Sequence, residues 1–340
     1  MKRGWPPILP LLALTAAAPP PLQFEVGRQR PAPWPETAAR FPHGVRASAD
    51  IIYSQPPHYR PLRLDLYRPH TRKAPLPLIV HVHGGAWMTG TKRHGGPIKD
   101  FPAVLAQFAA NGFAVASVEY RLDGEAAFPA AIQDVKTAIR FLRFHAREYG
   151  IDPARVGIFG GSAGGQLAAL ASTSCGVAKL EPPADRDAPD LTQISDCVQA
   201  GVSWYGVHDF ATVPTPPGQT GPAPYFGCEG RCSRDVLAFA SPVTYVDSRD
   251  PPMLLIHGEA DTLVAVSQTQ QFEAALKSAQ VPVTAIYIPA VDHGFVGKTD
   301  EDTYRANMKA LSETLAFFEN RLTSARKSEP RRSGTPLPSP

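Results

Sequence analysis

The sequence predicts an α/β fold in which a mostly parallel sheet of eight strands carries helices on both faces, together with a loop-rich cap. Uniformly apolar runs of strand length, such as 76–82 and 252–256, alternate with stretches whose apolar residues recur three and four apart. At one strand-to-helix junction, an apolar run breaks on glycines around a single serine. Because alternating strands and helices cover both faces of a sheet, this order favours a doubly wound, parallel arrangement.

The composition indicates a protein that acts on small molecules. The chain has 340 residues, of which 43% are hydrophobic and 19% charged, and its formal net charge is +3. Such values are ordinary for a globular protein, and we expect one large domain over residues 46–322. Part of the small positive charge comes from the terminal segments, so no nucleic-acid surface is indicated.

The two ends of the chain differ in composition from the middle. Residues 1–18 have the pattern of an export signal, in which Lys2 and Arg3 precede a short apolar run and three alanines. We expect residues 19–45 to form an extended, proline-rich lead-in and residues 323–340 a disordered, basic and proline-rich tail. These features predict a secreted or periplasmic protein with no membrane-spanning segment once the signal is removed. Because prolines follow directly at 19–21, cleavage elsewhere or retention of the segment as an anchor is the alternative.

Eight apolar segments predict the sheet. They cover residues 51–53, 62–67, 76–82, 113–118, 155–159, 198–205, 252–256 and 283–288. The first two are half-exposed and are expected to pair antiparallel at an edge, whereas the later runs are more uniformly apolar and are expected to be buried. Residues 207–240 hold many prolines and glycines and are expected to form the cap as an ordered but irregular loop.

The helix predicted to begin near Pro129 has one clear apolar face. This face consists of Ile132, Val135, Ile139 and Leu142. Asp134 lies off that face, and we expect it to be a structural hydrogen-bonding group.

The serine junction has the pattern of a nucleophile elbow. Ser162 lies between Gly160 and Gly164, which have no Cβ to clash where a strand and a helix approach each other closely. Such a turn exposes the serine hydroxyl at the helix N-terminus. A glycine-rich turn with an ordinary capping serine is the alternative, so the remaining motifs decide between the two.

A second glycine turn follows the apolar run 76–82, in the sequence His83-Gly84-Gly85-Ala86-Trp87. Glycines in a loop at the end of a buried strand let backbone amides face a ligand, as an oxyanion hole requires. The amides expected to take this role are those of Gly84, Gly85, Ala86 and Ala163. We expect His83 to organise the loop and His81, on the same strand face, to be a core residue.

An acid and a base follow the last two predicted strands. Asp261 comes after the run 252–256, with Glu259 as the competing carboxylate in the same loop, and His293 comes after 283–288. The chain order of serine, acid and histidine is that of α/β hydrolases, and each residue follows a buried strand. The sequence therefore predicts a catalytic triad of Ser162, Asp261 and His293.

These motifs together resemble the hormone-sensitive-lipase-like branch of α/β-hydrolase esterases, and within it the acetylxylan and feruloyl esterases that act on carbohydrate. The resemblance covers roughly 45–320 and depends on segments 83–87, 120–122, 128–131, 257–261 and 293–295 and on the elbow. Two departures stand out: Ala86 replaces the third glycine of the family's His-Gly-Gly-Gly turn, and Asp-Gly-Glu follows Tyr-Arg-Leu at 120–122.

The resemblance implies a serine carboxylester hydrolase for short-chain acyl esters, including acetyl or feruloyl groups on carbohydrate, with no cofactor and no metal. An amide hydrolase of the arylformamidase type is similar in its glycine turn. A prolyl-oligopeptidase-type peptidase shares the triad order, although this chain has no room for the usual propeller domain. A binding module resembling the gibberellin receptors would have lost a triad residue, and all three are present.

Aromatic residues near the predicted strand ends are candidates for the walls of a substrate pocket. They are Trp87, Trp204 and Tyr205, with packing in the core as an equal alternative.

The four cysteines are Cys175, Cys197, Cys228 and Cys232, all between the serine helix and the acid. An even count in an exported chain predicts two disulfides, with Cys175–Cys197 and Cys228–Cys232 as the local pairing. A zinc site is disfavoured because the set has one C-x₃-C pair and no His-x₃-His partner.

Overall fold

The computed structural model describes residues 37–71, 74–182, 191–213 and 223–323. These residues belong to one compact unit, Glu36–Pro340. The expected export signal, most of the expected lead-in and nearly all of the expected tail lie outside the described residues.

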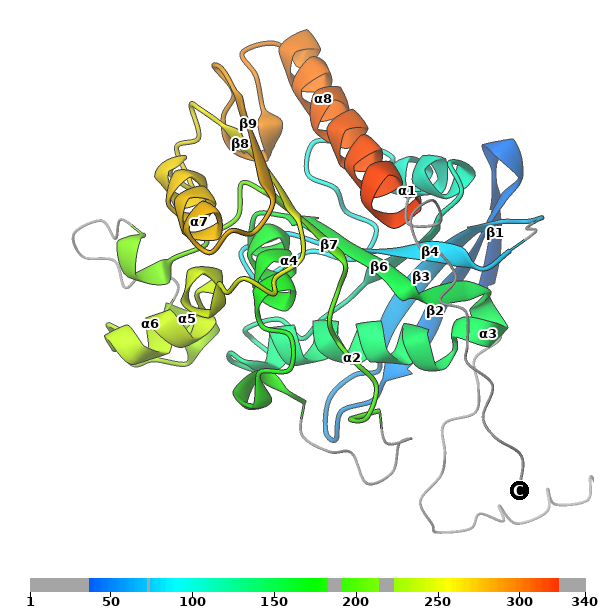
Figure 1. Cartoon of the computed structure of the whole chain (residues 1–340), viewed down its shortest axis with the longest axis horizontal. Helices are drawn as coiled ribbons and strands as arrows, with labels where there is room; N and C mark the ends of the chain where they lie inside the picture. The colour runs from blue at the N-terminus through cyan, green and yellow to red at the C-terminus, as the bar shows by residue number, and fades with distance from the viewer. Residues whose placement is uncertain (1–36, 72–73, 183–190, 214–222, 324–340) are drawn as a thin grey trace, which may run out of the picture. The chain divides into compact units, whose positions relative to one another are not determined.

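The described strands form a single mixed sheet in the order β1-β2-β3-β5-β4-β6-β7-β8-β9 (Figure 1). Their bounds are β1 Thr37–Phe41, β2 Val45–Ser54, β3 Leu62–Pro69, β4 Leu76–Val82, β5 Ala114–Val118, β6 Ile151–Gly161, β7 Ala200–Trp204, β8 Met253–Gly258 and β9 Val283–Ile288. The first three strands are antiparallel, and β5, β4, β6, β7, β8 and β9 run parallel to one another. This is the mostly parallel arrangement of the α/β-hydrolase fold.

The prediction of eight strands was wrong by one, because the sheet has nine in the described part of the chain. β1 lies within the expected proline-rich lead-in and pairs with β2, which itself begins at Val45 and not near residue 51. Val45 and Ala47 are buried while Arg46 is exposed, so the start of β2 does alternate in period two. β1 has a single sheet neighbour, and its side chains form no strong apolar pattern.

Helices cover both faces of the sheet (Figure 1). Their bounds are α1 Phe101–Ala110, α2 Ala130–Phe144, α3 Ala146–Tyr149, α4 Ala163–Thr173, α5 Ala223–Phe226, α6 Arg234–Ala240, α7 Ser267–Ser278 and α8 Asp300–Phe318. α1 and α8 bury their apolar residues in one core cluster around Phe159, whereas α2 and α4 share a second cluster on the other face. Short single turns complete the set: η1 Pro42–Gly44, η2 Ala178–Leu180, η3 Phe210–Thr212, η4 Pro242–Tyr245, η5 His293–Phe295 and η6 Glu319–Thr323.

The periodicity of α2 predicts its buried face well. All four predicted face residues are fully buried. Asp134, off that face, accepts hydrogen bonds from the Arg121 amide at 2.8 Å and from the Arg121 guanidinium. It therefore ties the loop after β5 to α2, in the structural role expected for it.

The segment between β7 and β8 is more regular than the loop we expected. In its described parts it contains η3, α5 and α6. Tyr225 of α5 stacks on Trp87 with ring centroids 4.4 Å apart, and Phe210 lies 5.5 Å from the same ring. Helices of four and seven residues are too short to show an apolar periodicity in sequence, which is why this structure was missed.

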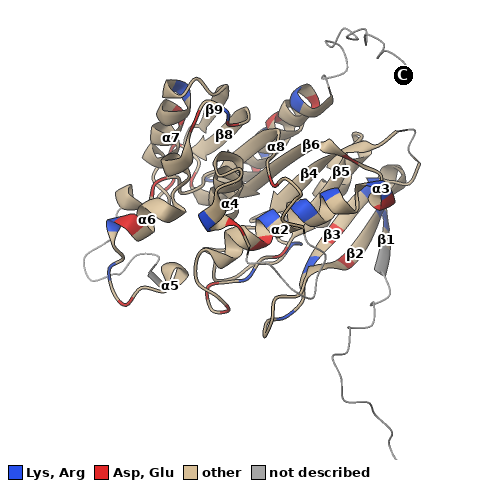
Figure 2. Ribbon diagram, turned by 60° about the horizontal axis from the view of Figure 1, so that its bottom comes forward, with Lys and Arg blue, Asp and Glu red and all other residues tan. Residues whose placement is uncertain are grey.

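Charged residues of both signs are interspersed along the described elements (Figure 2), in keeping with the small net charge of the sequence. Among the described helices, none has both the length and the apolar character needed to cross a bilayer.

Candidate active site

The elbow serine sits in a backbone conformation that few residues adopt. Ser162 joins β6 to α4 with φ 57° and ψ −122°. Holding a residue in such a sparsely populated backbone region costs about 1–3 kcal/mol of conformational free energy. A Cβ on Gly160 would lie 2.4 Å from the carbonyl oxygen of Gly164, and one on Gly164 would lie 2.1 Å from that of Val82. The glycines are therefore required for β6 and α4 to meet closely enough to raise the serine hydroxyl above the sheet edge.

Three side chains from distant parts of the sequence form one hydrogen-bonded chain. Ser162 Oγ lies 2.9 Å from His293 Nε2, and His293 Nδ1 lies 2.8 Å from Asp261 Oδ2. The side chain of Asp261 is fully buried, and that of His293 is 19% exposed. The structure thus brings together the three residues that the sequence assigned to a triad, with the serine at the accessible end.

The environment of Asp261 keeps it ionised. Its Oδ1 atom accepts hydrogen bonds from the amides of Leu263 at 2.9 Å and Val264 at 2.8 Å. Burial alone would raise the pKa of Asp261, but hydrogen bonds from His257, His293 and Val264 outweigh it and hold the pKa well below its ordinary value. The competing Glu259 is exposed, so the structure favours Asp261 as the partner of the histidine.

Asp292 clamps the acid loop to the histidine loop. Its Oδ1 atom accepts hydrogen bonds from the Thr262 amide at 2.8 Å and from the His293 amide at 2.7 Å. These bonds also lower the pKa of Asp292. Sequence reasoning assigned it no role, because nothing in the pattern around 291–295 shows which residue of the other loop it meets.

The glycine turn after β4 is built on unusual backbone conformations. Gly85 has φ 119°, Ala86 φ 52° and Trp87 φ 61°. The amides of Met88 and Thr89 both donate to the Gly85 carbonyl at 3.0 Å. Ala86 therefore has the positive φ that glycine adopts without strain, at the position where the related motif has its third glycine.

Backbone amides at this turn and at the elbow are unpaired. Among the described residues, those of Gly84, Gly85, Ala86 and Ala163 donate no backbone hydrogen bond. A Cβ on Gly84 would lie 3.5 Å from the Cβ of Ser162, so the turn runs directly beside the serine. These are the amides that the sequence assigned to an oxyanion hole.

His83 organises this turn as a neutral group. Its Nδ1 atom lies 2.8 Å from the carbonyl oxygen of Gly84, and its ring stacks on Tyr120 with centroids 4.3 Å apart. Burial lowers the pKa of His83 to about 4, so the ring is neutral. Because a carbonyl oxygen only accepts, Nδ1 carries the hydrogen and donates it to Gly84. His81 is a buried core residue whose Nδ1 lies 2.8 Å from Ser117 Oγ.

The three aromatic pocket candidates are all buried, but they differ in position. Trp204 packs in the core and donates from Nε1 to Thr314 of α8 at 3.0 Å, so it does not line the site. Trp87 donates from Nε1 to Gln166 of α4 at 3.1 Å and lies under the cap. The ring centroid of Tyr205 lies 4.8 Å from that of His293, so Tyr205 packs directly beside the histidine of the hydrogen-bonded chain.

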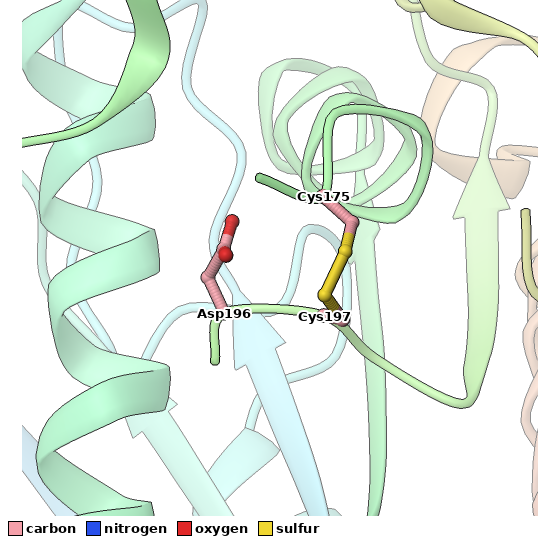
Figure 3. A group of neighbouring side chains, drawn as sticks. All are labelled: Cys175, Asp196 and Cys197. Carbon is pink, nitrogen blue, oxygen red and sulfur yellow. A yellow bond between two sulfur atoms is a disulfide. The ribbon is translucent and has the colours of Figure 1, made fainter. Parts of the chain in front are cut away.

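The cysteines form Cys175–Cys197 and Cys228–Cys232, the local pairing of the two predicted disulfides. Figure 3 shows Asp196 beside the first of them. Both sulfurs of this group are bonded to each other, and Asp196 Oδ2 forms an ion pair with Lys136 Nζ at 2.6 Å. The donors of this cluster are thus engaged within the protein and do not fit a metal ion.

The fold and the Ser-His-Asp arrangement define an α/β hydrolase. Residues 64–276 match the family model described as BD-FAE, and the chain belongs to this family. The match includes Ser162 and Asp261 and ends before His293. The resemblance to α/β-hydrolase esterases that the motifs predict is confirmed by this match.

Curated relatives include two proteins of Mycobacterium tuberculosis. The chain is 32% identical to "Esterase LipQ", over 82% of this chain and 64% of the relative. It is 30% identical to "Probable carboxylic ester hydrolase LipM", over 77% of this chain and 59% of the relative. The chain thus spans about three fifths of the length of these relatives.

Solved structures give the same fold. A truncated form of a carbohydrate esterase from gut microbiota is 28% identical with a TM-score of 0.67, covering 86% of this chain and 99% of that one. A bifunctional GH43-CE protein of Bacteroides eggerthii is 32% identical with a TM-score of 0.69, covering 81% of this chain and 38% of that one. A thermophilic esterase from Thermogutta terrifontis is 26% identical with a TM-score of 0.62, and the match covers 78% of this chain and 91% of that one.

Proposed function

We propose that this protein is a serine carboxylesterase that removes short acyl groups, such as acetyl or feruloyl, from carbohydrate. The observation that carries the proposal is the hydrogen-bonded chain from Ser162 Oγ through His293 to Asp261, with distances of 2.9 and 2.8 Å. A hydroxyl aligned with an imidazole and a buried carboxylate is the arrangement that generates a serine nucleophile near neutral pH.

The proton positions follow from this chain. Asp261 is ionised, so His293 Nδ1 carries a hydrogen and donates it to Oδ2. Nε2 is then unprotonated and accepts the hydrogen of the Ser162 hydroxyl. The carboxylate fixes this tautomer and stabilises the imidazolium formed during the reaction.

Acylation and deacylation both use His293 as the proton carrier. Ser162 Oγ bonds to the ester carbonyl carbon while Nε2 takes its proton, giving a tetrahedral oxyanion. Nε2 then gives this proton to the leaving alcohol oxygen as the ester bond breaks, which leaves an acyl group on Ser162. Water attacks the acyl-enzyme, Nε2 takes one of its protons, and the carboxylic acid leaves as that proton returns to Ser162; the acid then loses its remaining proton to the solvent.

Backbone amides supply the stabilisation of the oxyanion. The amide of Ala163 and those of the Gly84–Ala86 turn are the donors, since they lie on both sides of the serine and are not used elsewhere in the backbone. Donors held rigidly by the fold need no reorganisation as charge develops, and removing one costs on the order of 10²- to 10³-fold in rate.

Two observations support a short acyl group. The bulky Trp87 follows the oxyanion turn and is fixed by Gln166 and Tyr225. The described part of the cap contains helices of only four and seven residues, without a long apolar helix to cover a fatty chain. Support for a carbohydrate alcohol comes from the family match and from similarity to the carbohydrate esterase from gut microbiota and the bifunctional GH43-CE protein.

A substrate panel tests this proposal. p-Nitrophenyl esters from acetate to palmitate, acetylated xylan, methyl ferulate and an N-formylated aromatic amine are offered to the wild type and to Ser162→Ala. We expect hydrolysis of acetyl to butanoyl esters by the wild type, release of acetyl or feruloyl groups, and none above background with Ser162→Ala. Preference for palmitate would indicate a lipase, preference for the formamide an amide hydrolase, and full activity of Ser162→Ala a different nucleophile.

We also propose a secreted or periplasmic location. Support comes from the N-terminal sequence pattern and from the two disulfides, which persist in oxidising compartments. Fractionation of cells that express the full chain with a C-terminal epitope tests this location. Recovery in the periplasm or medium is expected, and recovery in the reducing cytoplasm would contradict it.

A further inference from the structure

A second histidine contacts the buried carboxylate, and the reaction as written gives it no task. His257 is the penultimate residue of β8, and its side chain is fully buried. Its Nε2 atom lies 3.2 Å from Asp261 Oδ2 and 2.9 Å from the Val264 carbonyl oxygen. Its Nδ1 atom lies 2.7 Å from Thr269 Oγ1.

The neighbours of His257 determine its tautomer. Both oxygens beside Nε2 are acceptors, so an Nε2 atom without a hydrogen would place lone pairs against lone pairs in a buried site. Nε2 therefore carries a hydrogen and donates it between Asp261 and Val264. In the neutral imidazole Nδ1 accepts from the Thr269 hydroxyl, so both ring nitrogens have partners.

We propose that His257 is a positioning residue for the acid of the triad, an inference that rests on the proposed esterase function. The two loop amides of Leu263 and Val264 hold Oδ1 of Asp261 but leave Oδ2 to be fixed by other groups. Oδ2 meets His293 on one side and His257 on the other. The Nε2–H of His257 thus keeps the plane of the carboxylate turned so that Oδ2 faces His293 Nδ1.

This role predicts an effect on the chemical step and not on substrate binding. His257 is fully buried and reaches the reacting atoms only through Asp261 and His293. Loss of its hydrogen bond lets the carboxylate rotate, which misplaces the imidazole relative to Ser162. Small misplacements of catalytic groups are costly, on the order of 100-fold in rate for about 1 Å.

Replacing His257 by glutamine or by asparagine distinguishes the contribution of Nε2 from that of Nδ1. The side-chain amide of glutamine reaches the position of Nε2, whereas that of asparagine reaches the position of Nδ1. We expect His257→Asn to lower kcat on the order of 10- to 100-fold with KM changed by less than about two-fold, because the contact with Asp261 is lost. His257→Gln retains a donor at that place and is expected to lose less than about five-fold. Glu259→Gln changes an exposed side chain in the loop that carries Asp261 and is the matched control.

A double-mutant cycle with Asp261→Asn distinguishes positioning from a general structural role. If His257 acts through Asp261, His257→Asn produces no further loss of kcat once Asp261 has been replaced. Thermal unfolding is measured for each variant alongside the rates. If His257→Asn does not fold, the nearly isosteric Thr269→Val takes its place in the cycle, since it removes the hydroxyl that donates to Nδ1 and holds the His257 ring in place.

Each outcome of these experiments points to a different conclusion. Equal kcat for His257→Asn, His257→Gln and the wild type would overturn the inference, and so would a loss from His257→Asn that is the same with and without the Asp261→Asn change. Failure of the wild type to hydrolyse any ester, or full activity of Ser162→Ala, would overturn the proposed function itself. Two results together support the proposed function and the role of His257. The wild type hydrolyses esters while Ser162→Ala is inactive, and His257→Asn lowers kcat only when Asp261 is intact.

Discussion

The Nδ1 atom of His293 lies 2.8 Å from Oδ2 of Asp261, although 32 positions separate the two residues in the sequence. They meet because β8 and β9 are adjacent and parallel, so the loops that follow them leave the sheet at the same edge. Asp292 then ties these loops together through the amides of Thr262 and His293. The relative position of acid and base is therefore set by backbone contacts as well as by the side chains themselves.

Replacement of the acid is expected to affect activity far more than replacement of its neighbour. Asp261→Asn should lower kcat roughly 10³- to 10⁴-fold, because an amide no longer fixes the reactive tautomer of His293. Glu259→Gln, which alters an exposed carboxylate two positions away, should leave kcat near the wild-type value. Steady-state kinetics with p-nitrophenyl acetate measures both, and the reverse ranking would exchange the roles of the two residues.

The clamp between the two loops should contribute to the rate through geometry. Asp292→Ala removes the acceptor for the amides of Thr262 and His293 and is expected to lower kcat about ten-fold. Asp292→Asn retains one carbonyl oxygen and should recover most of this loss. Identical kinetics for the alanine and asparagine variants would show that the acceptor oxygen has no part in placing His293.

Acid should destabilise the fold in part through His208. Burial first, and then the nearby His257, lower the pKa of His208 to about 3, and its Nε2 lies 2.9 Å from Ser203 Oγ. His208 is neutral in the folded protein but binds a proton in the unfolded chain below about pH 6.5. Its contribution to stability is therefore complete above that pH and is lost as pH falls toward the folded pKa.

The matched variant is His208→Gln, which keeps a donor for Ser203 but does not titrate. Urea unfolding at pH 7.5 and 5.0 measures the free energy of unfolding for both proteins. The wild type should lose about 2 kcal/mol more than the variant across this interval, at about 1.4 kcal/mol per pH unit below 6.5. Equal losses in the two proteins would contradict the neutral state of His208.

The two disulfides should differ in their contribution to stability. Cys175 and Cys197 are 22 residues apart, whereas Cys228 and Cys232 are four apart. Because a longer closed loop removes more entropy from the unfolded chain, loss of the first should cost about 3 kcal/mol and loss of the second about 2 kcal/mol. Chemical denaturation of the two double-serine variants measures this, and a larger loss for the short loop would contradict it.

A thiol titration checks the disulfides directly. The denatured, unreduced protein should contain no free sulfhydryl, and it should contain four after reduction, one for each cysteine. Four free groups before reduction would exclude both bonds.

The strongest sequence patterns predicted most of the sheet and the positions of the site residues. The four-residue apolar face of α2 and the uniformly apolar β4 and β8 leave few alternatives for their structure. Parallel strands also expose their carboxyl ends at one edge, so the motifs that follow β4, β6, β8 and β9 had to lie near one another. Strand order and motif order together sufficed to collect Ser162, Asp261 and His293.

Features that depend on a single long-range contact were not predictable from the pattern. β1 is an edge strand without an apolar alternation, and its pairing with β2 is made by backbone groups. Trp204 sits at a strand end like Tyr205, yet its ring turns toward α8 while that of Tyr205 meets His293. Likewise, nothing in the sequence around His257 shows that its ring reaches Asp261.

The location of the acyl group in the covalent intermediate tests the proposed mechanism most directly. The wild type and His293→Ala are mixed with p-nitrophenyl acetate, quenched in acid within the first turnover and digested for peptide mass spectrometry. We expect a burst of p-nitrophenol from the wild type and an added acetyl group on Ser162, with neither in His293→Ala. An acetyl group on another residue, or turnover with no burst and no labelled Ser162 under conditions that trap acyl-enzymes, would contradict nucleophilic catalysis by this serine.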